Sequence, residues 1–134
     1  DVAVVHGFLG DRYGGVVLDS SRNDRLLAMA AKKTIVVVEN LVEPDDVLPG
    51  RHGVYLAPIH VDAVVHAPGG AHPTACRDHY PMDEGHLFGY LQAAKDEAAF
   101  KEYLDTYITG PAEHAEYLNR VGRQAIHDRH DSSV

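Results

Sequence analysis

The stretch that decides the fold reads Thr-Ile-Val-Val-Val-Glu-Asn and spans residues 34–40. Four successive β-branched residues follow Thr34, and such side chains crowd a helix but pack well on a pleated sheet. Because the run is apolar at every position, we expect an interior strand with helices covering both faces of its sheet. A helical pattern comes just before it, and strand–helix–strand order favours parallel pairing.

Two shorter apolar runs lie upstream of this strand. Residues 1–6 predict a strand that Gly7 closes, and a glycine-rich loop separates it from a second short strand at residues 16–18. The two strands should form a hairpin or a strand pair. An apolar stripe over residues 26–31, with Asp24 in the first turn and Lys32-Lys33 at the end, then predicts a helix of about three turns, with Ser20, Ser21 or Asn23 at its N-cap.

The remainder of the chain changes from strand to helix. Residues 61–66 predict another strand, ended by Pro68-Gly69-Gly70. Before it, residues 43–58 predict a loop that contains a short extended piece at its end. Three helices are expected from Asp83 onward.

The last helix should carry Pro111 at its first position and Gly122 just after its end. The fold class is therefore α/β, with an open, mostly parallel sheet flanked by helices and a helical carboxyl-terminal segment. We expect residues 123–134, rich in His, Asp and Arg, to be a weakly anchored and disordered tail.

Length and composition exclude several classes of protein. A chain of 134 residues with 45% hydrophobic and 24% charged residues fits one globular domain, residues 1–134. Its net charge of −8 repels phosphate backbones and anionic lipid, so neither nucleic acid nor a membrane is an expected partner. The single cysteine, Cys76, forms no internal disulfide, which favours a cytoplasmic location. The chain starts without Met on the apolar run Val2–Val5, so we expect it to be a fragment of a longer protein.

The segment Ala67-Pro68-Gly69-Gly70-Ala71-His72-Pro73-Thr74 is the first candidate for chemistry. It follows a strand, where open α/β sheets place their ligands, and its glycines let backbone amides approach a ligand closely. The alternative is a tight turn in which His72 only packs against Pro73. Phosphate-binding and dinucleotide-binding glycine patterns are both absent, so neither ATP nor a dinucleotide is expected.

Glu39 and Asn40 are the weaker candidates, because they end the deciding strand. A carboxylate there could be desolvated and poised as a nucleophile or base, or it could be a solvated loop carboxylate. Cys76 is expected to be buried rather than nucleophilic.

Metal binding is not expected, since the ten histidines form no H-x-x-x-H or H-E-x-x-H pattern. The one histidine cluster worth testing would gather His6, His60, His66 and His72 at one sheet edge.

The order of these motifs resembles the α chain of glutaconate CoA-transferase-like enzymes, the family I CoA-transferases, in its carboxyl-terminal half. The residues that carry the resemblance are Val-Asp-Ala-Val-Val at 61–65, then Gly-Ala-His-Pro at 70–73, and the helices that run through Tyr117-Leu118-Asn119. The strand at residues 1–6, with Asp11-x-x-Gly14, and residues 28–42 look like the preceding elements of the same family. The resemblance covers nearly the whole chain.

This resemblance implies an enzyme that moves CoA between carboxylic acids through a glutamyl-CoA thioester. Its partners would be the missing amino-terminal half and a β-type subunit, its substrates an acyl-CoA and a carboxylic acid, and it would hold no permanent cofactor. The catalytic glutamate would lie outside this chain, on the β-type subunit for the transferases or in the missing amino-terminal half for the related hydrolases. Glu39 is not given this role, because the family's Glu-Asn-Gly context is only partly matched at Glu39-Asn40-Leu41.

Within that interpretation, Gly69, Gly70, Ala71, His72 and Pro73 would line the acyl-CoA pocket, with backbone amides near the thioester oxygen. Two other functions remain open: a ring-cleaving acyl-CoA hydrolase on the same scaffold, and a non-catalytic segment that builds a subunit interface.

Overall fold

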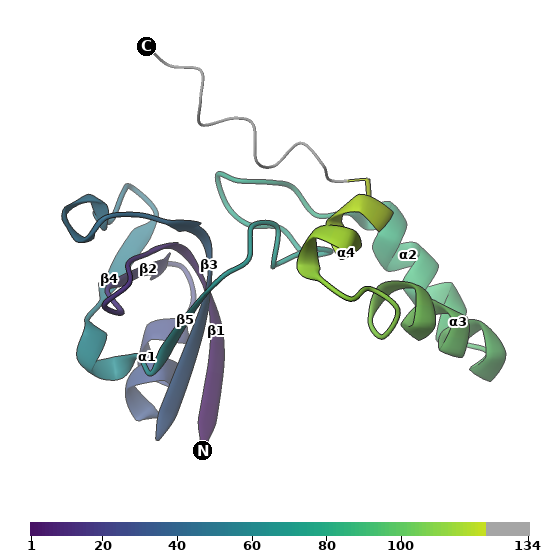
Figure 1. Ribbon diagram of the computed structural model, residues 1–134, viewed down its shortest axis with the longest axis horizontal. Coiled ribbons are helices and arrows are strands. Elements are labelled where there is room, and N and C mark those ends of the chain that lie inside the picture. Colours follow the sequence, from purple (N-terminus) through teal and green to yellow (C-terminus); the bar gives the residue numbers. More distant parts are fainter. Residues whose placement is uncertain (123–134) are drawn as a thin grey trace, which may run out of the picture. The chain divides into compact units, whose positions relative to one another are not determined.

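The computed structural model describes residues 1–122 and divides the chain into two compact units, Asp1–Gly70 and Ala71–Val134. The first unit is the strand-rich part of Figure 1 and the second is its helical part. Among the described residues, no helix combines the length and the apolarity needed to cross a membrane.

The first unit is built on one five-stranded sheet of order β4-β2-β1-β3-β5. The strands are β1 (Val2–Gly10), β2 (Val16–Asp19), β3 (Lys33–Leu41), β4 (Gly53–Leu56) and β5 (Ala63–His66). β1, β3 and β5 are parallel neighbours, whereas β2 runs antiparallel to both β1 and β4. Four of the five strands therefore point the same way, which confirms the predicted α/β class with a mostly parallel sheet.

β3 is the interior strand that the β-branched run predicts. It pairs with β1 from Val2↔Lys33 to Gly10↔Leu41 and with β5 from Ile35↔Ala63 to Val38↔His66. The predicted pairing of β1 with β2 is confirmed as well.

β1 is longer than expected, because Gly7 lies inside it rather than at its end. A Cβ at Gly7 would lie 2.9 Å from the carbonyl oxygen of Val17, so the glycine allows close packing beside an irregularity in the β1–β2 register.

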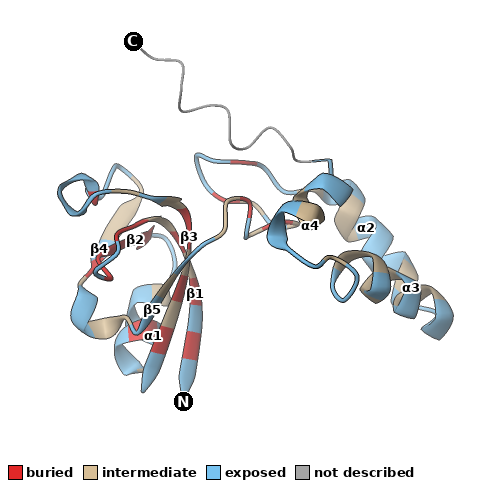
Figure 2. Cartoon of the chain, in the orientation of Figure 1, coloured by how far each residue is buried: buried red, intermediate tan, exposed pale blue. Residues whose placement is uncertain are grey.

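Only one face of this sheet is covered by a helix among the described residues of the first unit. The helix α1 (Asp24–Ala30) buries Ala28 against a core that includes Val5, Leu18 and Val36. On β1 the burial alternates, so Val2 and Val4 are 60% and 64% exposed on the opposite face (Figure 2).

The open face of the sheet, as we call it, carries Val2, Val4 and His6 from β1, Ile35 and Val37 from β3, and Ala63 and Val65 from β5. The expectation that helices cover both faces is therefore wrong for the described residues of this unit. The unbroken apolar run in β3 indicates that both faces of the sheet need to be covered. It does not indicate which residues cover the open face.

The connections in the first unit are short. Two 3₁₀ turns, η1 (Pro44–Asp46) and η2 (Pro58–His60), flank β4, which is the short extended piece expected at the end of the loop. The helix α1 has two turns rather than about three, and its N-cap Asn23 makes no side-chain capping bond.

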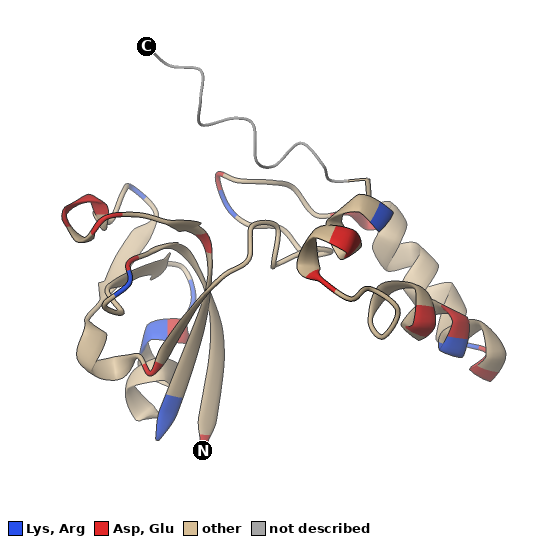
Figure 3. Ribbon diagram, viewed as in Figure 1, with Lys and Arg blue, Asp and Glu red and all other residues tan. Residues whose placement is uncertain are grey.

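Three helices form the second unit, as predicted: α2 (Glu84–Ala93), α3 (Glu97–Tyr107) and α4 (His114–Arg120). Asp83 caps α2 through the amide of His86, and Asp96 caps α3 through the amide of Ala99. Acidic residues lie along α3, and others lie in η1 of the first unit (Figure 3).

The expected start of α4 is wrong, since the helix begins at His114, behind its N-cap Glu113, and Pro111 lies in the preceding loop. Its expected end is confirmed, since Gly122 directly follows the C-cap Val121. The predicted tail, residues 123–134, lies outside the described residues.

Replacing Gly7 by alanine tests the close packing of β1 on β2. The added Cβ would meet backbone at 2.9 Å and the Leu18 side chain at 3.2 Å, so we expect a loss of about 1–3 kcal/mol in the free energy of unfolding, as for other overpacked sites. Urea denaturation of the full chain measures it. Gly50→Ala is the control, because nothing lies within 4 Å of a Cβ there; equal stability of the two variants would contradict the packing argument.

Candidate functional site

In the first unit, the candidate residues gather where the parallel strands end. β1, β3 and β5 end at Gly10, Leu41 and His66, and the turn with Gly69 and Gly70 follows β5 directly. Ligands of open α/β sheets bind at this end of the strands.

Glu39, near the end of β3, is a buried carboxylate. Its side chain is 1% exposed, its Oε1 lies 2.8 Å from Nε2 of His6, and its Oε2 accepts a 2.7 Å hydrogen bond from the amide of Gly69. A buried carboxylate needs such partners, since an isolated charge is costly away from water. Glu39 is therefore a desolvated carboxylate rather than a solvated loop carboxylate. Asn40, the next residue, is half-buried.

The turn after β5 brings Gly69 and Gly70 close to this carboxylate. Gly69 has a φ of 74°, which favours glycine, and Gly70 donates its amide to the carbonyl of Ala67 at 2.9 Å. A Cβ on Gly70 would lie 2.7 Å from that carbonyl oxygen. Both amides therefore already have acceptors, and as they stand they are not free donors for a thioester oxygen, contrary to expectation.

Ala71, His72 and Pro73 begin the second unit. The amide of Ala71 donates to the Tyr80 hydroxyl at 2.9 Å. The imidazole of His72 is fully buried, with Nε2 3.1 Å from a carboxylate oxygen of Asp83 and Nδ1 2.5 Å from the Tyr117 hydroxyl. His72 thus links this segment to the start of α2 and to α4, rather than only packing against Pro73.

Asp83 receives several hydrogen bonds in this unit. The backbone N–H of His86 lowers the pKa of its carboxyl most, and the imidazole of His72 lowers it further. Asp83 is therefore a charged cap that holds both a helix end and a buried ring.

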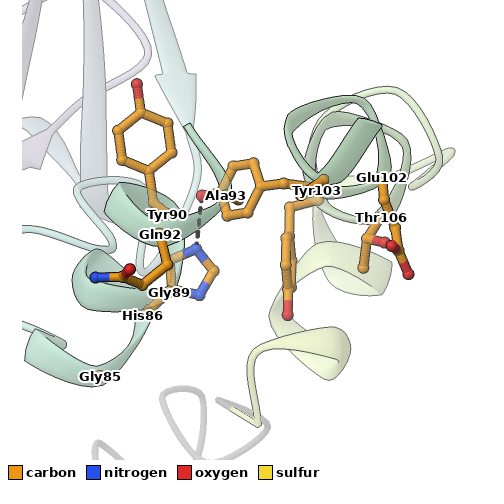
Figure 4. Close-up of a pocket in the computed structure, with 11 residues that line it drawn as sticks. Gly85, His86, Gly89, Tyr90, Gln92, Ala93, Glu102, Tyr103 and Thr106 are labelled. Carbon is orange, nitrogen blue, oxygen red and sulfur yellow. Dashed lines mark hydrogen bonds between the residues drawn. The ribbon is translucent and has the colours of Figure 1, made fainter. Parts of the chain in front are cut away.

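A cluster of aromatic rings lies between α2 and α3. His86 Nε2 lies 2.8 Å from the Tyr103 hydroxyl, and its ring meets the ring of Tyr107 edge-on, with centroids 4.7 Å apart. Burial raises the pKa of Tyr103, and the neighbouring phenols Tyr107 and Tyr90 raise it further. These residues line a groove of about 640 Å³ (Figure 4).

Cys76 and the four histidines of the expected cluster lie in several different segments of the chain. Cys76 is buried, as expected, and its backbone pairs with that of Tyr80. The expected histidine cluster does not form in the first unit: His60 lies in η2, before β5, whereas His66 ends β5 and is on the opposite face of the sheet from His6.

The pairing of His6 with Glu39 is absent from the sequence-based expectations, since the two residues are 33 positions apart. The pairing follows from the parallel register, which places His6 opposite Val37, two residues before Glu39, and the sequence pattern does not give that register.

Comparison with known proteins shows which class of protein this chain resembles. No protein-family model matches the chain. The chain is 32% identical over 122 residues to the A-type component of 3-oxoadipate CoA-transferase from Pseudomonas knackmussii, covering 90% of the chain and 43% of that relative. It is 35% identical over 114 residues to the IpdA component of the cholesterol ring-cleaving hydrolase from Rhodococcus jostii, covering 82% of the chain and 38% of that relative.

A solved structure also matches this chain. Glutaconate coenzyme A-transferase from Acidaminococcus fermentans matches with a TM-score of 0.83 and 31% identity, over 91% of this chain and 39% of that chain. The chain is thus homologous to CoA-transferase α subunits, and the expected resemblance to the α chain of glutaconate CoA-transferase is confirmed. It spans less than half the length of these relatives.

The lowered pKa of Asp83 predicts how the second unit responds to acid. A carboxyl whose folded pKa is depressed stabilises the fold above its ordinary value of 3.8, and this contribution is lost as the pH falls through the lower folded pKa. Asn still caps a helix but does not titrate in this range. We therefore expect Asp83→Asn to flatten the loss of helical circular dichroism below pH 3.8; parallel acid curves for the two proteins would contradict this role of Asp83.

Proposed function

We propose that this chain is part of a CoA-transferase α subunit that moves CoA between carboxylic acids through a glutamyl-CoA thioester. The observation that supports it is the similarity to CoA-transferase α subunits over about nine-tenths of the chain. The proposed substrates are an acyl-CoA and a carboxylic acid, with no permanently bound cofactor.

The proposed reaction needs a carboxylate that can reach the thioester. This carboxylate attacks the thioester carbonyl carbon, the C–S bond breaks, and CoA leaves as a thiolate from the mixed anhydride that has formed. The thiolate then attacks the enzyme's own acyl carbon and releases the first carboxylic acid. An acceptor acid reverses both steps.

Glu39 is a poor choice for this nucleophile. Both of its carboxylate oxygens are engaged, and its side chain is 1% exposed. An attacking carboxylate must instead come within about 3–3.5 Å of the thioester carbon. This supports a catalytic glutamate outside the present chain, on another part of the assembly.

The segment from Gly69 to Pro73 is proposed to line the acyl-CoA pocket through its shape. Gly70 is exposed, and its lack of a side chain lets a ligand approach the backbone closely. Because the amides of Gly69, Gly70 and Ala71 are already bonded, the donors for the thioester oxygen are proposed to come from elsewhere in the assembly.

The proposed partners are the rest of the α subunit, its amino-terminal half, and a β-type subunit. The open face of the sheet supports this, since a parallel sheet is normally covered on both faces. In the second unit, Phe88 and Leu91 on α2 are 64% and 57% exposed, which suits a further protein contact. A net charge of −8 supports neither nucleic acid nor membrane binding, and a cytoplasmic location is proposed.

Ring-cleaving hydrolysis of an acyl-CoA is the second candidate function, favoured by the similarity to the IpdA component of the ring-cleaving hydrolase. The two functions differ in their need for an acceptor acid. We expect the assembly isolated with this chain to consume acyl-CoA only when a second carboxylic acid is present. Consumption with water alone would favour the hydrolase.

Replacing Gly70 by valine tests the place of the turn in the pocket. A Cβ there would approach the Ala67 carbonyl and the Val37 side chain, at 2.7 and 3.2 Å, and the branched side chain would fill the proposed approach path. We expect acyl-CoA turnover to fall at least about tenfold, since small misplacements at a reacting centre cost up to about 100-fold.

Gly50→Val, in an open loop of the same unit, is the matched control and should keep full turnover. Unchanged turnover in a folded Gly70→Val assembly would remove the turn from the site.

A further inference from the structure

We propose that Glu39 is a positioning residue: its single buried carboxylate fixes both the ring of His6 and the backbone of Gly69. It thereby presents Nδ1 of His6 and the Gly69–Gly70 turn to the acyl-CoA. The proposal rests on the proposed function and adds to it a role for two residues that do not supply the nucleophile.

The two oxygens of Glu39 reach two different segments of the chain. β3 lies between β1 and β5, so a side chain near its end can contact both the neighbouring strand and the turn after β5. Oε1 is 2.8 Å from His6 Nε2, on β1, and Oε2 is 2.7 Å from the amide nitrogen of Gly69. One group therefore sets the position of a ring and of a turn at the same time.

The sheet does not need this carboxylate to hold its strand ends together. Backbone hydrogen bonds from Val42 to Gly10 at 2.9 Å and from Ala67 to Val38 at 3.0 Å already join the same ends. A buried carboxylate is costly to desolvate, and an apolar side chain of similar size would fill the space without that cost. The position is thus better explained by the orientation of its two partners than by stability.

His6 is the partner that can contact a ligand. It lies on β1 beyond Val2 and Val4, nearer to the strand ends where Glu39 and Gly69 lie, and its side chain is 25% exposed. A carboxylate only accepts hydrogen bonds, so Nε2 of His6 donates to Glu39 and the neutral ring keeps its lone pair on Nδ1. Within the described residues, Glu39 hydrogen-bonds to this ring at Nε2, which leaves Nδ1 to face a ligand.

Asp62 offers a matched control at the other end of the same strands. It precedes β5, and its carboxylate accepts from the amide of Thr34 at 2.8 Å and from the ammonium of Lys33 at 2.7 Å, both at the start of β3. Asp62→Asn therefore weakens a second carboxylate link between β3 and β5, in a more exposed position and far along the strands from Glu39.

The first experiment uses the assembly isolated with the full chain and a panel of short-chain acyl-CoA donors with propionate as acceptor. Glu39→Gln keeps the shape of the side chain, and His6→Phe keeps a ring but removes the hydrogen bond. We expect both to lower kcat at least about tenfold with little change in KM or melting temperature.

Asp62→Asn should lower the melting temperature and keep kcat. A Glu39→Gln assembly with kcat within about twofold of the unmodified protein, or an equal loss of kcat in Asp62→Asn, would overturn the proposal.

A second readout needs no turnover and uses nitrogen NMR of the full chain. We expect Glu39→Gln to reduce the Nε2–H tautomer of His6 and to shift the Gly69 amide away from the position of a charge-assisted hydrogen bond. Asp62→Asn should leave both signals in place. Unchanged His6 and Gly69 signals in Glu39→Gln would overturn the positioning role, whereas an assembly that turns over no acyl-CoA while these signals respond would refute the proposed function alone.

Discussion

The parallel pairing of β3 with β1 on one side and β5 on the other is the constraint on which the rest of the first unit depends. It places the ends of three strands at one edge of the sheet, and it makes the side chains of β3 neighbours of both flanking strands. Glu39 can bond to His6 and Gly69 only because of that arrangement. The same pairing creates a sheet with two apolar faces, of which α1 covers one.

The candidate segment after β5 is held by different chemistry on its two sides. Gly69 is tied to a buried carboxylate of the sheet, whereas His72 is tied to Asp83 and Tyr117 within the helical unit. In each unit the buried polar group bonds to parts of the chain far away in sequence, which is how a small domain fixes the position of a loop. Each end of the segment is therefore anchored within its own unit, and the amides of Gly69, Gly70 and Ala71 already bond to the protein.

Much of the fold could be predicted because it follows from local pattern. The β-branched run at 35–38 and the three helices after Asp83 depend on side-chain shape and periodicity, which are read along the chain. The role of Gly7 could not, because a glycine that permits close packing of two strands has the same letter as one that ends a strand. The pairing of His6 with Glu39 depends on strand register, which periodicity does not contain, and nothing in the apolar pattern says which residues cover the open face.

The proposed function has the chain provide a sheet edge and a helical surface to a larger assembly that handles acyl-CoA; the open face of the sheet, and the short part of its relatives that the chain spans, support it. Native mass spectrometry of the protein, recovered from its source cells without denaturation, tests this account most directly. The account predicts a species heavier than this chain, with further polypeptide bound. A monomer with the mass of the chain alone would contradict it.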